Sequence, residues 1–105
     1  MNQQKKTESP VARRLRSART KVGISQKQLG IQAGMDQFSA SPRINQYERG
    51  KHVPDFATAA RLAQVLLIPV TYLYADNDEL AELILLFTSA TKEVQEETLN
   101  TLRNQ

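Results

Sequence analysis

The stretch SQKQLGIQAG, residues 25–34, decides the fold of this chain. Ser25 and Gln28 stand at the spacing of a capping box, so a helix is expected to begin at Ser25. Gly30 lies inside this helix, where glycine costs up to about 1 kcal/mol relative to alanine, and its presence predicts the close approach of another backbone. Gly34 is expected to end the helix. The stretch therefore predicts a short helix that leads through a glycine turn into a tightly packed neighbour.

A second helix is expected over INQYERG, residues 44–50, with one buried and one exposed side. Ile44 and Tyr47 are three residues apart, so they share a helix face that can pack on the preceding helix. The other side chains of this segment are polar and would then point outward. The segment therefore predicts a helix with one packed face and one polar, exposed face.

The rest of the chain also shows helical spacing of apolar residues and almost no strand pattern. A helix is expected between Ser9 and Gly23, another after the cap Asp55 that Pro69 stops, a short one over VTYLY, and two more towards the C-terminus. In the helix between Ser9 and Gly23 and in the helix after Asp55, the apolar positions are expected to face the core: Val11, Leu15, Ala18, Val22, Phe56, Ala59, Leu62, Ala63 and Leu66.

Length and composition indicate a single domain of 105 residues, with no cysteine and one histidine. Disulfides and cysteine-ligated zinc are excluded, and a lone histidine leaves no basis for a metal cluster, so we expect no cofactor. No apolar run approaches the roughly 18 residues of a membrane span, and the first residues lack a signal peptide, so a cytoplasmic protein is expected. No paired catalytic carboxylates, nucleophile and base, or phosphate-binding glycine loop is evident, so we do not expect an enzyme.

Charge is divided unevenly along the chain. Residues 1–52 hold eleven lysines and arginines against three acidic residues, 11 − 3 = +8. Residues 53–105 hold three basic residues against eight acidic ones, 3 − 8 = −5. Such a split is typical of a half that binds a polyanion joined to a half that is solvated or faces a partner.

Residues 12–74 resemble the helix-turn-helix domain of the Cro and phage-repressor family, the XRE-like regulators. The resemblance is carried by SQKQLG, by the turn at Gly34, by Ile44 and Tyr47 in the recognition helix, and by ERGK with the following PD. It implies an all-α fold: a compact five-helix repressor-like DNA-binding domain at 9–75, preceded by a flexible basic arm at 1–8. Two C-terminal helices at 76–105 are expected to serve dimerisation or to extend the core.

The resemblance also implies roles for particular residues on and around the recognition helix, whose N-terminal part enters the major groove in this family. Arginine can bond guanine, and glutamine or asparagine can bond adenine. The candidates for base readout are Arg43 and Gln46, followed by Ser41 and Asn45. The candidates for phosphate contact are Gln26, Lys27, Arg49, Lys51 and His52, with Lys5 and Lys6 on the arm. Arg19 and Glu48 match a family ion pair that fixes the angle of the recognition helix.

The segment before the recognition helix departs from the family. Ile44 follows Gly34 by ten positions, about four more than usual, so QFSAS forms a longer turn or an added helical turn. Two starts fit the recognition helix: Ser41 as cap with Pro42 at the first helical position, or Ser39 as cap.

The inserted side chains have two interpretations. Gln37 and Ser39 lie where the protein approaches DNA, and both are candidates for additional DNA contacts. Phe38 would either widen this contact or pack the longer turn on the body of the domain, and we expect it to be buried.

Residues 78–103 resemble the two-helix tail that many of these regulators carry. Its apolar stripes can join the core or meet a second subunit, and a homodimer is expected through Leu80, Leu83, Ile84, Phe87, Val94, Leu99 and Leu102. The expected function is sequence-specific binding of double-stranded DNA by a transcriptional regulator, a repressor acting by operator occlusion. The alternative is an antitoxin or adaptor that uses its acidic C-terminal helices on a protein partner, with DNA binding secondary.

Overall fold

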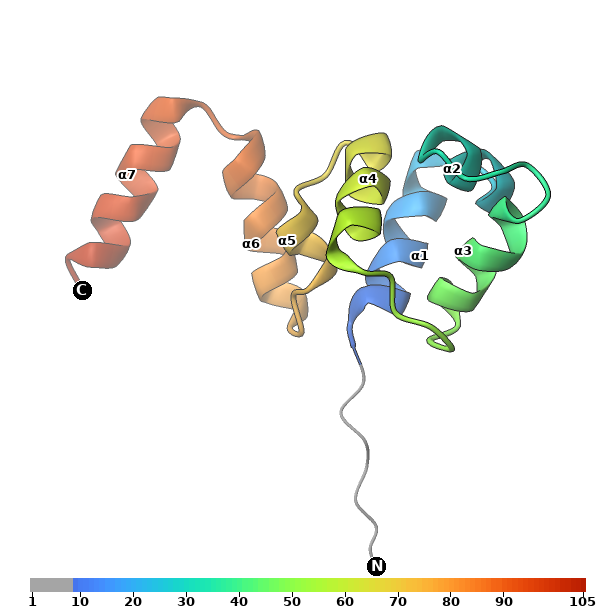
Figure 1. Cartoon of the computed structure of the whole chain (residues 1–105). Coiled ribbons are helices and arrows are strands. Elements are labelled where there is room, and N and C mark those ends of the chain that lie inside the picture. Colours follow the sequence, from blue (N-terminus) through green and yellow to red (C-terminus); the bar gives the residue numbers. More distant parts are fainter. Residues whose placement is uncertain (1–8) are drawn as a thin grey trace, which may run out of the picture.

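The computed structural model describes residues 9–105, and over this range the chain forms seven α-helices and no strand (Figure 1). The expectation of an all-α fold is therefore confirmed. The predicted basic arm at 1–8 lies outside the described residues. The helices are α1 (Val11–Val22), α2 (Gln26–Gln32), α3 (Ala40–Glu48), α4 (Phe56–Leu66), α5 (Val70–Leu73), α6 (Asp78–Ser89) and α7 (Lys92–Arg103).

Side-chain caps begin four of the helices. Ser25 accepts a hydrogen bond from the backbone N–H of Gln28, whose side chain accepts from Ser25 N–H in return, so the predicted capping box is present. Asp55, Asn77 and Thr91 each accept from the backbone N–H three residues ahead, which starts α4, α6 and α7. The beginnings of these four helices thus follow local side-chain chemistry.

The end of α4 is less favourable. Leu67 adopts a left-handed conformation with φ 58°, and it is the one non-glycine residue of the described chain with a positive φ. Its side chain is 91% exposed. A branched side chain is strained in this conformation, which costs roughly 1–2 kcal/mol.

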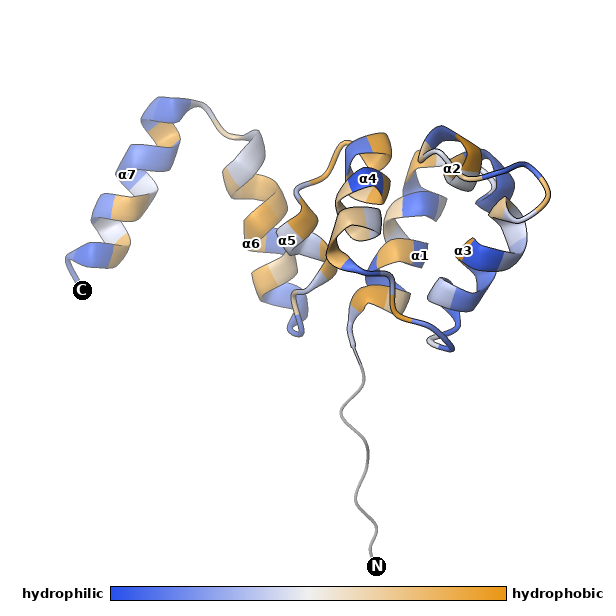
Figure 2. Ribbon diagram, in the orientation of Figure 1, coloured by the Kyte–Doolittle hydropathy of each residue, from blue (hydrophilic) through white to orange (hydrophobic). Residues whose placement is uncertain are grey.

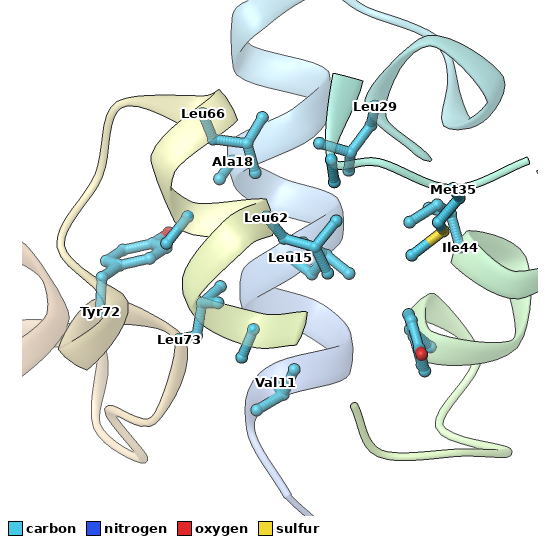
Figure 3. Packing of buried hydrophobic residues seen from close by; sticks show 14 of the residues in the cluster. Val11, Leu15, Ala18, Leu29, Met35, Ile44, Leu62, Leu66, Tyr72 and Leu73 are labelled. Carbon is cyan, nitrogen blue, oxygen red and sulfur yellow. The ribbon is translucent and has the colours of Figure 1, made fainter. Parts of the chain in front are cut away.

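The core lies between α1, α2, α3, α4 and α5 and is formed by apolar side chains that point inward from each of them (Figure 3). Leu15, Leu29, Ile44, Leu62 and Leu73 have no exposed surface. Figure 2 shows this division along the chain, with orange apolar positions on α4, α5 and α6 and mostly blue polar positions on α3 and α7.

Two residues expected in this core are on the surface instead. Val22 is 53% exposed and Phe56 is 65% exposed. Each stands at one end of its helix, where the helical face continues beyond the edge of the packed neighbours. The periodic pattern identified the face correctly but could not show how far the neighbouring elements cover it.

Gly30 is packed directly against the start of α3, which confirms the predicted close approach. A Cβ atom on Gly30 would lie 2.6 Å from Ala40 Cβ and 2.9 Å from Ala40 Cα. Ala40 is itself fully buried. The missing side chain at Gly30 therefore sets how closely α2 and α3 approach each other.

The turn between α2 and α3 contains the inserted residues. The helix α3 begins after Ser39, and Pro42 is its third residue, so the second of the two expected starts is found, although the Ser39 side chain makes no capping hydrogen bond. Proline is tolerated there because the first-turn N–H groups have no partner within the helix. Met35, not Phe38, fills the interior beside the turn. Phe38 is 81% exposed, so the expectation that it would be buried is wrong.

The helix α6 extends the core, whereas α7 stands apart from it (Figure 1). Ala81 is buried in the main core, and Ile84 and Leu85 pack against it. By contrast, α7 contains no buried residue. Its side-chain hydrogen bond to the rest of the chain runs from Gln95 Nε2 to the carbonyl oxygen of Phe87, at 2.7 Å.

Arginines of α1 hold the beginning of α6. Arg14 Nε donates to the carbonyl oxygen of Ala75 at 2.9 Å, and its guanidinium lies 5.7 Å from the centroid of the Tyr72 ring. The terminal nitrogen Nη2 of Arg14 lies 2.9 Å from Asp78 Oδ1, and this is an ionic contact without good hydrogen-bond alignment. Arg13 donates to the same carboxylate oxygen at 3.1 Å. The charged guanidinium groups of Arg14 and then Arg13, both close to Asp78 Oδ1, lower the pKa of the Asp78 carboxyl below its ordinary 3.8.

Candidate nucleic-acid interface

The recognition helix α3 has two distinct faces. Ile44 and Tyr47 are buried, and they attach the helix to α2 and the core. Pro42, Arg43 and Gln46 are exposed on the other side. The expected separation of a packed face from a polar face is present, and the polar face is free to meet a ligand.

An ion pair fixes α3 on α1. Arg19 Nε donates to Glu48 Oε2 at 2.6 Å, and its terminal nitrogen Nη2 donates to Oε1 at 2.9 Å, so the pair is bidentate. The Glu48 side chain is only 3% exposed. Arg19 also donates to the carbonyl oxygen of Ile24 at 2.9 Å. The hydrogen bond to Glu48 raises the pKa of Arg19 above its usual value, so the guanidinium is charged throughout the accessible pH range.

Gln26, the first residue of α2, forms hydrogen bonds to the recognition helix. Its amide nitrogen donates to Asn45 Oδ1 at 3.2 Å and to Glu48 Oε1 at 3.1 Å. Both hydrogens of this amide are thereby used inside the protein. The arrangement leaves the Asn45 amide nitrogen as the donor that can still reach outward. Sequence reasoning did not foresee this link.

The two leading readout candidates, Arg43 and Gln46, lie on the exposed side of α3. Arg43 donates to the hydroxyl oxygen of Tyr47 at 3.1 Å, one helical turn further on. This bond uses one N–H of the terminal nitrogen Nη2 and leaves the other N–H groups of the guanidinium available. Ser41 is half-buried. These side chains share one helix and differ in how far they reach from it.

Three positive side chains and a histidine lie around the recognition helix. Lys27 is exposed on α2, while Arg49, Lys51 and His52 are exposed in the loop after α3. A cleft of about 530 Å³ opens between this loop and the start of α1. Arg49 and His52 line it from the loop.

Two further arginines line this cleft from α1, and sequence reasoning did not single them out. Arg13 and Arg16 are three residues apart, so they share a face of α1. That spacing was visible in the sequence. Their position opposite the loop after α3 was not, because it depends on how α1 and α3 cross.

The comparisons with known proteins agree with this geometry. Residues 10–83 match the family model described as "Helix-turn-helix domain". The crystal structure of the transcriptional regulator BswR shares 50% sequence identity with this chain, with a TM-score of 0.83. The match covers 90% of this chain and 93% of that one, so it takes in part of α6 and α7. The comparison with curated proteins gives no match.

The family match covers well over half of the chain and coincides with the helices that present and fix α3. No helix within residues 9–105 is long and apolar enough to cross a membrane. The chain belongs to the helix-turn-helix family and is an XRE-like, DNA-binding transcriptional regulator.

Proposed function

We propose that this protein is a cytoplasmic repressor that binds a two-fold symmetric DNA site as a homodimer and blocks transcription by occupying it. The observation that carries the proposal is the exposed polar face of α3, held rigidly from behind by Glu48 and Arg19. Preorganised side chains lose little freedom on binding, so they can discriminate between bases.

Direct readout is assigned first to Arg43 and Gln46. Arg43 carries the planar fork that matches the O6 and N7 atoms of guanine, and Gln46 matches the N6 and N7 atoms of adenine. Each bidentate pair contributes about 1–3 kcal/mol of discrimination. Ser41 and the free amide nitrogen of Asn45 are secondary readers.

Phosphate contacts are assigned to Lys27, Arg49, Lys51 and His52, with the cleft arginine Arg16 as an addition. Each neutralised phosphate contributes about −0.9 to the slope of log affinity against log salt. Gln26 is proposed to position α3, because its amide hydrogens are engaged by Asn45 and Glu48. A contact between Gln26 and phosphate would then use its backbone N–H.

The homodimer is assigned to the apolar surface of α6 and α7. The two helices form an open groove of about 330 Å³ lined by Thr71, Leu83, Ile84, Phe87, Thr88, Thr98, Leu99 and Leu102. Outside it, Leu80, Leu86 and Val94 are also exposed. An isolated α7 without buried contacts would gain little from remaining helical, since most helical stability in proteins comes from packing.

The occupant that we propose for this groove is the corresponding surface of a second copy. A two-fold interface uses the same patch on both subunits. The amphipathic α7 lines the groove of its own subunit, and its apolar side chains can also insert into the groove of the second subunit. Such a dimer would place two recognition helices about one turn of DNA apart, roughly 34 Å. Occupancy of adjacent major grooves is sufficient for repression by occlusion.

The test of DNA recognition is selection from random duplex DNA at several salt concentrations. The wild-type protein should select a two-fold symmetric motif and bind more weakly as salt rises. Arg43→Ala/Gln46→Ala should lose the motif but keep salt-sensitive binding. Arg61→Ala/Gln64→Ala is the matched control, because it removes an exposed arginine and glutamine at the same spacing on α4. Loss of the motif in both double variants, or in neither, would contradict the assignment of α3.

The test of assembly and repression uses the same protein. Sedimentation should give a dimer for the wild type and a monomer for Leu83→Asp/Leu99→Asp, and only the dimer should recognise both half-sites. In transcription with purified polymerase, the protein should reduce transcripts from a promoter that carries the selected site. More transcripts would contradict repression. A wild-type monomer would contradict the dimer and favour a different protein partner for the acidic helices.

A further inference from the structure

Phe38 is left in water by the fold. It is 81% exposed, more than either of the other two phenylalanines of the chain. A large aromatic ring gains from leaving water, and Met35 already occupies the nearby place in the core. The exposed ring therefore has no partner among the described residues.

The turn holds Phe38 outward by a set of backbone bonds. The N–H of Phe38 donates to Asp36 Oδ2 at 3.0 Å. The N–H groups of Ser39 and Ala40 donate to the Asp36 carbonyl oxygen at 3.1 and 2.9 Å. On the other side, Met35 N–H donates to the Gly30 carbonyl oxygen at 2.9 Å. Since the turn is anchored at both ends, the backbone position of Phe38 is fixed by the fold, and its exposed side chain projects from this turn.

The position of this turn restricts what the ring can meet. Phe38 stands two residues before Ala40, the first residue of α3. In helix-turn-helix proteins the N-terminal part of the recognition helix enters the major groove. Ala40 and Arg43 are separated by about 4.5 Å along the helix axis, at 1.5 Å per residue. A ring just before Ala40 therefore falls within about two or three base pairs of the Arg43 contact, at a rise of about 3.4 Å per base pair.

We propose that Phe38 reads the C5-methyl group of a thymine in the major groove, beside the bases read by Arg43 and Gln46. The ring has no hydrogen-bonding atom, so the group that it can recognise on a base edge is apolar. The thymine methyl is the apolar group of the major groove, and it distinguishes thymine from cytosine. The inference rests on the proposed DNA-binding function and adds a reader from the inserted turn.

The experiment measures equilibrium binding of the full chain to its selected site, with one thymine at a time replaced by deoxyuridine. This replacement removes the methyl group and leaves the hydrogen-bonding edge unchanged. At one thymine in each half-site, wild-type affinity should fall about four-fold, the effect of burying one methylene-sized group. Phe38→Ala should bind the unmodified site about ten-fold more weakly and should respond less than two-fold to the same replacement. A cytosine at this position should bind wild type poorly, and 5-methylcytosine should restore the affinity.

Two controls separate the possible failures. Leu67→Ala removes an apolar side chain that is even more exposed, at a helix boundary away from α3, and should leave the uridine profile unchanged. Unchanged melting temperatures would show that the variants are folded. If Phe38→Ala keeps the wild-type affinity, or loses as much as wild type at every uridine, the Phe38 proposal is overturned. If the selected motif is also insensitive to Arg43→Ala, the proposed function of α3 fails with it.

Discussion

Gly30→Ala tests whether the approach of α2 to α3 is set by the missing side chain. The new Cβ would lie 2.6 Å from Ala40 Cβ, 2.9 Å from Ala40 Cα and 3.2 Å from the Ala40 carbonyl carbon. Carbon atoms that are not bonded prefer separations of about 3.5–4.0 Å. Two of the three contacts are with backbone atoms, so a side-chain rotation cannot relieve them. The recognition helix would have to move by about 1 Å, which is the difference between the shortest of these contacts and the preferred separation.

The expected cost follows from two opposing effects. Overpacking in a well-packed core destabilises by about 1–3 kcal/mol. Alanine favours the helix over glycine by up to about 1 kcal/mol, which offsets part of this. We expect Gly30→Ala to lower the free energy of unfolding by about 1–2 kcal/mol, a loss of roughly 4–8 °C in melting temperature for each kcal/mol.

Urea denaturation followed by circular dichroism measures this loss, and binding to the selected DNA measures the displacement of α3. Gln32→Ala, at an exposed position of the same helix, is the control for a neutral change. Adding Ala40→Gly should recover part of the stability, because it removes the shortest contact and leaves the two with backbone. A Gly30→Ala variant as stable as wild type would refute the reasoning.

Three further predictions concern other parts of the fold. Leu67→Gly should raise the free energy of unfolding by about 0.5–1 kcal/mol by relieving the left-handed strain, as thermal denaturation would show; no gain would refute it. Glu48→Ala should cost about 3–5 kcal/mol because it strands Arg19, and the double variant with Arg19→Ala should cost less than the sum of the two single changes in urea. Asp78 has a pKa lowered mainly by Arg14, so its stabilisation is present above the ordinary pKa of 3.8 and lost as pH falls below it. Asp78→Asn should flatten the dependence of stability on pH in that acid range, and an unchanged pH profile would count against the contact.

The amino-acid sequence by itself determined the features that depend on neighbours along the chain. Ser25 and Asp55 begin their helices because a side-chain oxygen and a backbone N–H three residues on are close in any such helix. Ile44 and Tyr47 share the buried face because helical periodicity places them there. The all-α class follows from these local rules, whereas the helix-turn-helix was indicated by the resemblance of residues 12–74 to a known family.

Only the tertiary structure decided which surfaces remain open and which distant groups meet. Met35 is in the core whereas Phe38, three residues later, is exposed, and no local rule decides which apolar residue of a turn is buried. Gln26 bonds Asn45 across the turn because α2 and α3 approach closely at Gly30. These outcomes depend on how helices cross, and a crossing is set by the summed packing of many side chains, not by spacing along one segment.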